Sequence, residues 1–181
     1  MRVLVVYESM YGNTHVVAGN IADGLRAVHE VILVPVADAT AEIVASADLL
    51  VAGAPTHMHG LPRPATRRMA ADAASKNPSD QWLDPAIIGP GIRDWLGGLG
   101  GGQALAAAFD TRLNGVPLLT GRASRVIGRL LKRHGYRLVV APESFLVSQR
   151  NTLLDGEASR ARCWGAALGA TVSNVSSSAL A

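Results

Sequence analysis

Short apolar runs alternate along the chain with stretches in which apolar residues recur at helical spacing. The first run, Val3 to Val6, is rich in β-branched residues and has no charge, which is typical of a strand buried on both faces. After it, Val17, Ile21 and Leu25 recur on one helix face. The same pattern predicts strands at 2–7, 30–35, 48–53, 104–109 and 137–148, and helices near 13–27, 40–46, 63–75, 121–134 and 156–171.

Five strand–helix units in strict alternation predict an α/β fold with a parallel sheet and helices on both faces. Right-handed crossovers make it a doubly wound, three-layer sandwich. The length of 181 residues favours one domain, which we expect at 1–172, followed by a frayed tail at 173–181. The fifth strand is expected to be interrupted only at Pro142-Glu143.

The stretch at 76–102 breaks this regular spacing, because it is rich in proline and glycine. A short helix is predicted from Ile92 to Leu96, and the rest is predicted to be a loop over the sheet edge. The run GGLGGG precedes a strand and does not join a strand to a helix. It is therefore interpreted as a flexible connector and not as a phosphate loop.

The composition is that of a globular protein, with 49% hydrophobic and 17% charged residues. No apolar run reaches the roughly 18 residues that a membrane span requires. Met1-Arg2 leads directly into the first strand, which leaves no room for a signal peptide. The single cysteine, Cys163, cannot form an internal disulfide and fits a reducing compartment. We therefore expect a cytoplasmic protein without a membrane span.

The chain is mildly basic, with a formal charge of +3 and a pI of about 9.5. Much of the excess lies on one predicted helix, where the cations share an arc of roughly 100°. That arc is either a solvated helix face or a docking surface for an acidic partner or an anionic substrate. No aromatic residues interleave with the charges, so nucleic acid is not an expected partner. The cations are Arg122, Arg125, Arg129, Lys132 and Arg133.

In an open, doubly wound sheet, ligands bind beyond the carboxyl ends of the strands. The first strand is followed by Ser9-Met10-Tyr11-Gly12-Asn13-Thr14, and a helix is predicted to begin near Asn13. The amino end of that helix offers unpaired N–H groups, and glycine lets a ligand come close to the backbone. With the neighbouring hydroxyl and amide groups, this turn could hold a phosphate without lysine or arginine.

Three other phosphate-site types do not match the sequence. There is no G-x-x-x-x-G-K-[ST] run, and Gly12 alone does not make a G-x-G-x-x-G fingerprint. A phospho-acceptor domain of the same topology would need an aspartate at the end of the third strand. That strand ends instead in Ala52-Gly53-Ala54-Pro55-Thr56.

These residues resemble the flavodoxin-like FMN-binding family. Residues 9–14 resemble its phosphate loop, [ST]-x-[TSY]-G-x-T, and GAPTHMHG at 53–60 is similar to its second flavin loop. AFDTRL at 108–113 falls where its third flavin loop should be. The resemblance covers nearly the whole chain and implies a five-stranded parallel sheet in the order 2-1-3-4-5.

The resemblance also implies an FMN site built from the three loops. The phosphate loop would be Ser9, Met10, Tyr11, Gly12, Asn13 and Thr14, with Pro55 and Thr56 at the ribityl chain and ring edge. The ring would lie between His57, Met58, His59 and Gly60 on one side and Phe109, Asp110, Thr111 and Arg112 on the other. The residues themselves leave other roles open. These are backbone capping for the two histidines, the core for Phe109, and pairing with Arg112 or a backbone turn for Asp110.

Two departures from the electron-carrying members keep the function open. Those proteins are acidic and place aromatic residues against the flavin, whereas this chain is basic and has no Trp or Tyr at the corresponding loop positions. We expect an FMN-binding electron carrier with a redox partner protein, monomeric or homodimeric. The Ser-Met-Tyr-Gly sequence at 9–12 is also similar to the phosphate loop of NAD(P)H:quinone oxidoreductases of this fold, which use small-molecule substrates. A flavodoxin-like protoporphyrinogen oxidase and a binding module with weak or lost flavin affinity are further alternatives. No catalytic residue or metal ligand is singled out.

Overall fold

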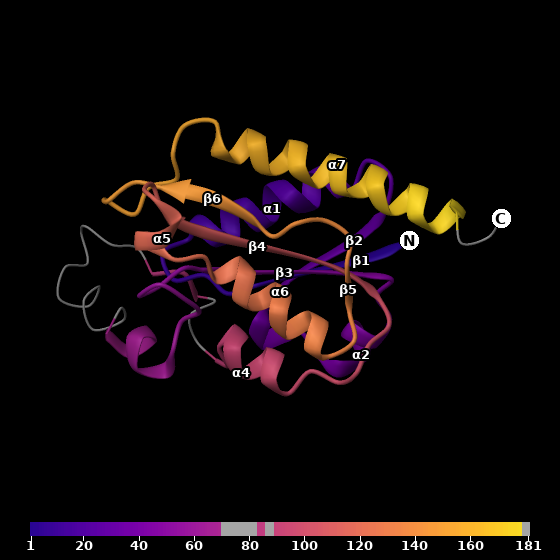
Figure 1. Ribbon diagram of the computed structural model, residues 1–181, viewed down its shortest axis with the longest axis horizontal. Helices are drawn as coiled ribbons and strands as arrows, with labels where there is room; N and C mark the ends of the chain where they lie inside the picture. The colour runs from indigo at the N-terminus through magenta and orange to yellow at the C-terminus, as the bar shows by residue number, and fades with distance from the viewer. Residues whose placement is uncertain (70–82, 86–88, 179–181) are drawn as a thin grey trace.

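The structure, a computed structural model, describes residues 1–69, 83–85 and 89–178 (Figure 1). The strands are β1 (Arg2–Tyr7), β2 (Glu30–Pro35), β3 (Leu49–Pro55), β4 (Leu105–Leu113), β5 (Arg137–Leu138) and β6 (Glu143–Val147). The helices are α1 (Asn13–Leu25), α2 (Ala41–Ala45), α4 (Ile92–Gly97), α5 (Pro117–Thr120), α6 (Ala123–Arg133) and α7 (Glu157–Ser178), with a 3-10 turn, η1, at Val36–Asp38. Residues 64–69 are also helical, but most of the rest of that predicted helix, and residues 76–82 and 86–88 of the predicted loop, lie outside the described residues.

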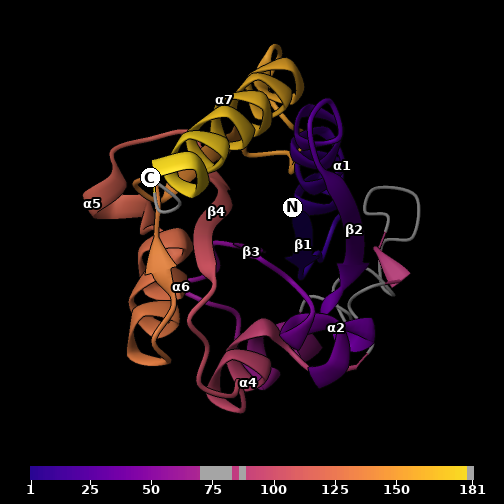
Figure 2. The same ribbon diagram turned by 90° about the vertical axis from the view of Figure 1, so that its right-hand side faces the viewer.

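The strands form one parallel sheet in the order β2-β1-β3-β4-β5, and β6 also pairs with β4. This confirms the predicted α/β fold and its 2-1-3-4-5 order. Helices α1 and α7 cover one face of the sheet, while α2, α4 and α6 cover the other (Figures 1 and 2). Because the strands are parallel, their carboxyl ends lie along one edge of the sheet.

The fifth strand is divided into two short segments, and the break is wider than predicted. Leu138 pairs with Ala106, and Glu143 pairs with Phe109. The chain therefore uses residues 139–142 to pass the two β4 residues 107 and 108. The surplus residues cannot all stay in the ladder, and Pro142 has no N–H to donate to it. The prediction that the interruption is confined to Pro142-Glu143 is wrong, because Glu143 belongs to β6.

Other boundaries differ mainly at the carboxyl ends of elements. β3 and β4 run to Pro55 and Leu113, past the predicted ends at 53 and 109. Helix α6 matches the predicted helix at 121–134, but α5 has no counterpart among the predicted elements. Helix α7 continues to Ser178, so the first part of the predicted frayed tail is helical. Residues 179–181 lie outside the described part, and the domain limit at 172 stays a prediction.

Two apolar cores lie on opposite faces of the sheet. Leu4 and Leu50 face α4 and α6, whereas Val3 and Val5 face α1 and α7. Successive residues of a strand point to opposite faces, so a central strand needs apolar residues at every position. This explains why the first strand reads as an unbroken apolar run.

Helices α1 and α7 approach each other closely at two glycines. A Cβ atom on Gly24 would overlap the carbonyl oxygen of Arg162, and one on Gly165 would overlap that of Ile21. Gly19, also in α1, has no such atom within 4 Å. The close contact holds α1 against the sheet and so fixes its amino end beside the carboxyl end of β1.

Helix α6 begins where two side chains accept hydrogen bonds from its first amides. Asp110 Oδ2 accepts from Ser124 N at 2.7 Å, and Thr56 Oγ1 accepts from Ala123 N at 2.8 Å. Asp110 is fully buried, and this burial raises the pKa of its carboxyl, although the Ser124 amide and nearby hydroxyls oppose the shift. Asp110 thus fixes the start of a helix.

We expect Gly24→Ala to lower the free energy of unfolding by about 1–3 kcal/mol, because the methyl group would push α1 away from α7. Gly19→Ala is the matched control in the same helix. It is expected to raise stability by up to about 1 kcal/mol, since alanine favours the helix and meets no neighbour. Urea unfolding of both variants measures the difference, and a similar gain in both would contradict the close packing.

Asp110→Asn tests the electrostatic cost of the buried carboxyl. Because folding raises the pKa of Asp110, its ionisation costs stability as pH rises above the unfolded value of about 3.9, and the cost is complete above the folded value. Asparagine keeps an acceptor for Ser124 N and removes the charge. We expect the variant to gain stability relative to the natural chain between pH 4 and pH 8, measured by denaturant midpoints. Asp155→Asn, at an exposed position, should show no such gain. A stability difference between Asp110→Asn and the natural chain that does not change with pH would refute the raised pKa of Asp110.

Candidate functional site

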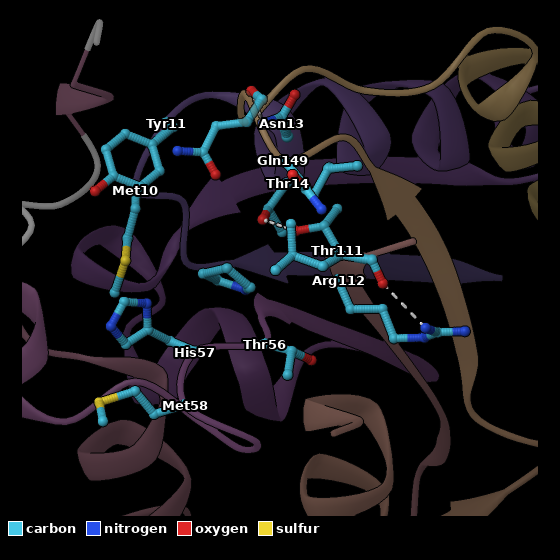
Figure 3. Close-up of a pocket in the computed structure, with 14 residues that line it drawn as sticks. Met10, Tyr11, Asn13, Thr14, Thr56, His57, Met58, Thr111, Arg112 and Gln149 are labelled. Atoms are coloured by element: carbon cyan, nitrogen blue, oxygen red, sulfur yellow. Dashed lines mark hydrogen bonds between the residues drawn. The ribbon is translucent and has the colours of Figure 1, made fainter. Parts of the chain in front are cut away.

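A pocket of about 330 Å³ opens at the carboxyl edge of the sheet, near the ends of β1, β3, β4 and β6 (Figure 3). Small-molecule sites usually occupy roughly 300–1,000 Å³. Four chain segments line the pocket, and none of the described lining residues is an aspartate or a glutamate. The lining residues are Met10, Tyr11, Asn13, Thr14, Pro55, Thr56, His57, Met58, Thr111, Arg112, Leu113, Val147, Gln149 and Asn151.

The loop from β1 to α1 presents the amino end of α1 to this pocket. Gly12, the residue before the helix, has a φ of 83°, a left-handed conformation that glycine adopts easily. Its N–H donates to the buried Ser9 Oγ at 3.1 Å, which holds the turn closed. The first intrahelical bond is donated by Val16 N, so the amides of residues 13–15 are not used within the helix.

Two side chains of this turn connect it to other parts of the site. Thr14 Oγ1 lies 2.8 Å from Thr111 Oγ1, so the start of α1 and the end of β4 share a hydrogen bond between hydroxyls. Asn13 Nδ2 donates to the carbonyl oxygen of Asn151 at 2.7 Å. The first turn of α1 contains no acidic residue. A helix amino end of this kind favours a bound anion.

A buried acidic group lies behind the same turn and does not line the pocket. Asp84 N donates to the carbonyl oxygen of Met10 at 2.9 Å, and Asp84 Oδ2 lies 3.3 Å from His15 Nδ1. The His15 ring stacks on Tyr7, with 4.7 Å between ring centroids. Burial, and then the Asp84 and Asp38 carboxylates, raise the pKa of Tyr7 to about 12. Tyr7 therefore stays neutral at physiological pH.

The loop after β3 is a tight turn with strained backbone. His57 N donates to Gly60 O at 2.9 Å, and Gly60 N donates to His57 O at 3.1 Å. Between them, Met58 and His59 have positive φ values of 46° and 70°, which is uncommon for residues with side chains. The turn lies so close to Gly121 that a Cβ atom there would overlap the His59 backbone. Such strain is frequent at binding sites.

His57, the first of the two histidines in this turn, lies between two neighbouring cavities. His57 and Met58 line the pocket, and they also line a second cavity of about 500 Å³ together with Arg63 and Arg93. Burial lowers the pKa of His57, so its imidazole is neutral near pH 7. His59 and Gly60 line only the second cavity.

The third predicted loop begins later than the sequence pattern indicates. β4 continues to Leu113 because residues 109–113 pair with β6 on one side, while 109–111 pair with β3 on the other. Phe109 is fully buried, and its ring packs edge-on against Phe145 at a centroid distance of 6.3 Å. Phe109 and Asp110 do not line the pocket. Phe109 lies in the core and Asp110 accepts a hydrogen bond at the start of α6, which are roles that the sequence left open for them.

Arg112 lines the pocket, but its guanidinium extends away from the centre toward the loop that carries α5 (Figure 3). Its Nη1 donates to the carbonyl oxygens of Leu113 and Gly115 at 3.1 and 2.9 Å and to Thr120 Oγ1 at 3.1 Å. Its Nε is buried and has no hydrogen-bond partner among the described residues. Arg112 therefore holds the α5 loop through its Nη1.

Four lining residues are absent from the sequence prediction: Leu113, Val147, Gln149 and Asn151. The last two lie in the turn between β6 and α7, where Asn151 adopts a φ of 55°. The rule that ligands bind at the carboxyl ends of strands applies to this turn as well. The turn-forming sequence SQRNT after the fifth strand was the available signal.

Of the predicted site residues, ten line the pocket, while Ser9 and Gly12 shape its first loop. No group of three or more histidine, cysteine, aspartate or glutamate residues suited to a metal ion occurs in the described part of the chain. Among the described helices, none is long and apolar enough to cross a membrane.

Comparisons with solved structures show the same fold. A flavodoxin from the domain Archaea is 15% identical, with a TM-score of 0.64 over 96% of this chain and 99% of that one. Flavodoxin 1 from Bacillus cereus is 20% identical, with a TM-score of 0.61 over 92% and 95%. A flavodoxin, WrbA-like protein from Agrobacterium tumefaciens is 24% identical, with a TM-score of 0.57 over 96% and 98%. A comparison with curated proteins finds no match.

The sequence itself matches a family model over the part that runs from within β1 to the end of β4. The flavodoxin family model covers residues 5–113, which is more than half of the chain. The matched stretch includes the turn before α1, the turn after β3 and the end of β4, which together form most of the pocket. The chain belongs to the flavodoxin family.

Proposed function

We propose that this protein binds FMN in the pocket and transfers electrons between redox partners in the cytoplasm. The observation that carries the proposal is the amino end of α1, which combines free amides, hydroxyl groups and a left-handed glycine with no acidic residue. The residue types fit the cofactor, because this donor set suits a phosphate and the rest of the pocket mixes apolar and polar side chains.

Under this proposal, residues of the first loop, from Ser9 to Thr14, hold the phosphate. Thr56, His57 and Met58 contact the ribityl chain and one side of the ring, and residues 111–113 contact the other. When bound, FMN supplies one- and two-electron redox chemistry. The protein supplies binding and electrostatics. Because the described lining holds Arg112 and no carboxylate, it favours an anionic cofactor and the addition of electrons to it.

A second candidate function is supported by the cavity that adjoins the pocket. The described residues that line it include Arg63 and Arg93 and no carboxylate, and it shares His57 and Met58 with the pocket. Such a cavity suits the phosphates of a nicotinamide dinucleotide. An NAD(P)H-dependent quinone reductase would use it to bring its electron donor next to the flavin.

Thr14→Val tests the phosphate position. The change keeps the shape of the side chain and removes the hydroxyl, so we expect the FMN dissociation constant to rise about tenfold to a hundredfold. Flavin fluorescence quenching during titration of the purified protein measures it. Thr171→Val, on α7 away from the pocket, should bind FMN as the natural chain does. Equal affinity in all three proteins would place the phosphate elsewhere, and no FMN binding by the natural chain would defeat the proposal.

The carrier and the reductase differ in their use of NADPH. For an electron carrier we expect no steady oxidation of NADPH by the FMN-loaded protein with a soluble quinone, measured at 340 nm, although dithionite still reduces its flavin. Sustained NADPH oxidation that is lost in Arg63→Ala would instead establish the reductase function and assign the second cavity to the donor.

A further inference from the structure

One group of exposed, large apolar side chains lies next to residues that line the pocket. Leu118 and Leu119 of α5 are 87% and 70% exposed, and Val116 and Met58 are also exposed. None of the α5 residues is buried, so the helix contributes nothing to either core. An apolar patch of this kind on a soluble protein typically marks an interaction site.

The patch is held in place by the site itself. Leu119 N donates to Val116 O at 2.9 Å, and Thr120 N donates to the same oxygen at 3.1 Å. From below, Arg112 donates to Gly115 O and to Thr120 Oγ1. A bridge between His59 and Gly121 joins the end of α5 to the turn after β3. The leucines are therefore presented on an anchored segment at the rim of the pocket.

A basic helix face follows directly after this apolar segment. The exposed cations of α6 are Arg125, Arg129, Lys132 and Arg133, and none of them forms an ion pair within the described part of the chain. Arg122, predicted to share their arc, instead donates to Ser144 Oγ and to Pro142 O. Only Gly121 and Arg122 separate α5 from α6, and Figure 2 shows both helices on the same flank of the molecule.

Helix stability explains only part of this basic face. Lys132 and Arg133 lie in the last turn of α6, where cations interact favourably with the helix dipole. Arg125 lies in the first turn, where a cation is unfavourable and an acidic residue would stabilise the helix. Arg125 therefore costs helix stability in the isolated protein, and an external anionic group would compensate for this cost.

We propose that α5 and the solvent face of α6 form one docking surface for an acidic redox protein. The leucines of α5 would be the apolar centre of the interface, next to the pocket, and the cations of α6 its charged rim. The inference rests on the proposed function, because the docking surface is assigned to the partner with which the bound flavin would exchange electrons. These charges, basic on this chain and acidic on its partner, are opposite to those expected for acidic electron carriers.

The test uses the full chain and an acidic plant-type [2Fe–2S] ferredoxin as the probe, with basic cytochrome c as the comparison. Isothermal titration calorimetry at low salt measures docking, and stopped-flow spectroscopy of the FMN-loaded protein measures electron transfer. Arg125→Glu and Arg129→Glu are expected to weaken ferredoxin binding about tenfold each and to flatten its salt dependence. Glutamate at 125 favours the helix, so loss of docking would not reflect misfolding.

Matched controls separate the surface from the overall charge. Arg162→Glu makes the same change of charge on α7, on the opposite face, and should change binding less than about twofold. Leu118→Ser should weaken binding about tenfold without altering the salt dependence, whereas Val28→Ser, at an exposed apolar residue outside the proposed surface, should have no effect.

Absence of ferredoxin binding, tighter binding of cytochrome c, or equal effects of Arg125→Glu and Arg162→Glu would overturn the proposal. Self-association lost in Leu118→Ser would assign the surface to a second copy of the chain, and tight binding of duplex DNA lost in Arg125→Glu would assign it to nucleic acid. Docking with the predicted pattern in a protein that does not bind FMN would refute the proposed function alone. FMN binding without docking would refute this inference alone.

Discussion

The site depends on strand β4, which stays in the sheet as far as Leu113 because β3 and β6 pair with it on its two sides. Its alternating side chains then serve different parts of the molecule. Phe109 and Thr111 point toward α1, the first into the core and the second to Thr14. Asp110 points the other way and fixes the start of α6. One ladder thus positions the pocket floor, the helix beside it and the α5 loop.

The distribution of charge follows from the same arrangement. Three acidic residues near the site are buried and engaged in contacts within the protein. Glu8 accepts from Ile92 N at 2.9 Å and lies 3.0 Å from Arg67 Nε. Asp84 lies near His15, and Asp110 accepts from Ser124 N. Cations remain beside the pocket and on the exposed face of α6. This arrangement of charge supports the proposed anionic ligand and acidic partner, although the net charge of the chain is small.

Patterns of apolar residues were sufficient to predict most of the fold. The runs that became β1 and β2 have the predicted bounds, and helix α1 begins at Asn13 as expected. The first loop was also predictable, because its backbone geometry depends on local residues such as Gly12. The wrong expectations concern the end of β4 and the fifth strand. Their pairing is set by residues distant in sequence, so local patterns left open whether Phe109 lies in the core or beside the pocket.

The sequence by itself determined the parallel α/β architecture and the glycine, hydroxyl and amide groups of the turn before α1, since both follow from short-range spacing and residue type. Only the tertiary structure decided which side chains reach the pocket. It brought Asn151 to Asn13, turned the Arg112 guanidinium toward the α5 loop, and left the α5 leucines exposed beside the basic face of α6. These features depend on strand register and helix packing, which act between residues far apart along the chain.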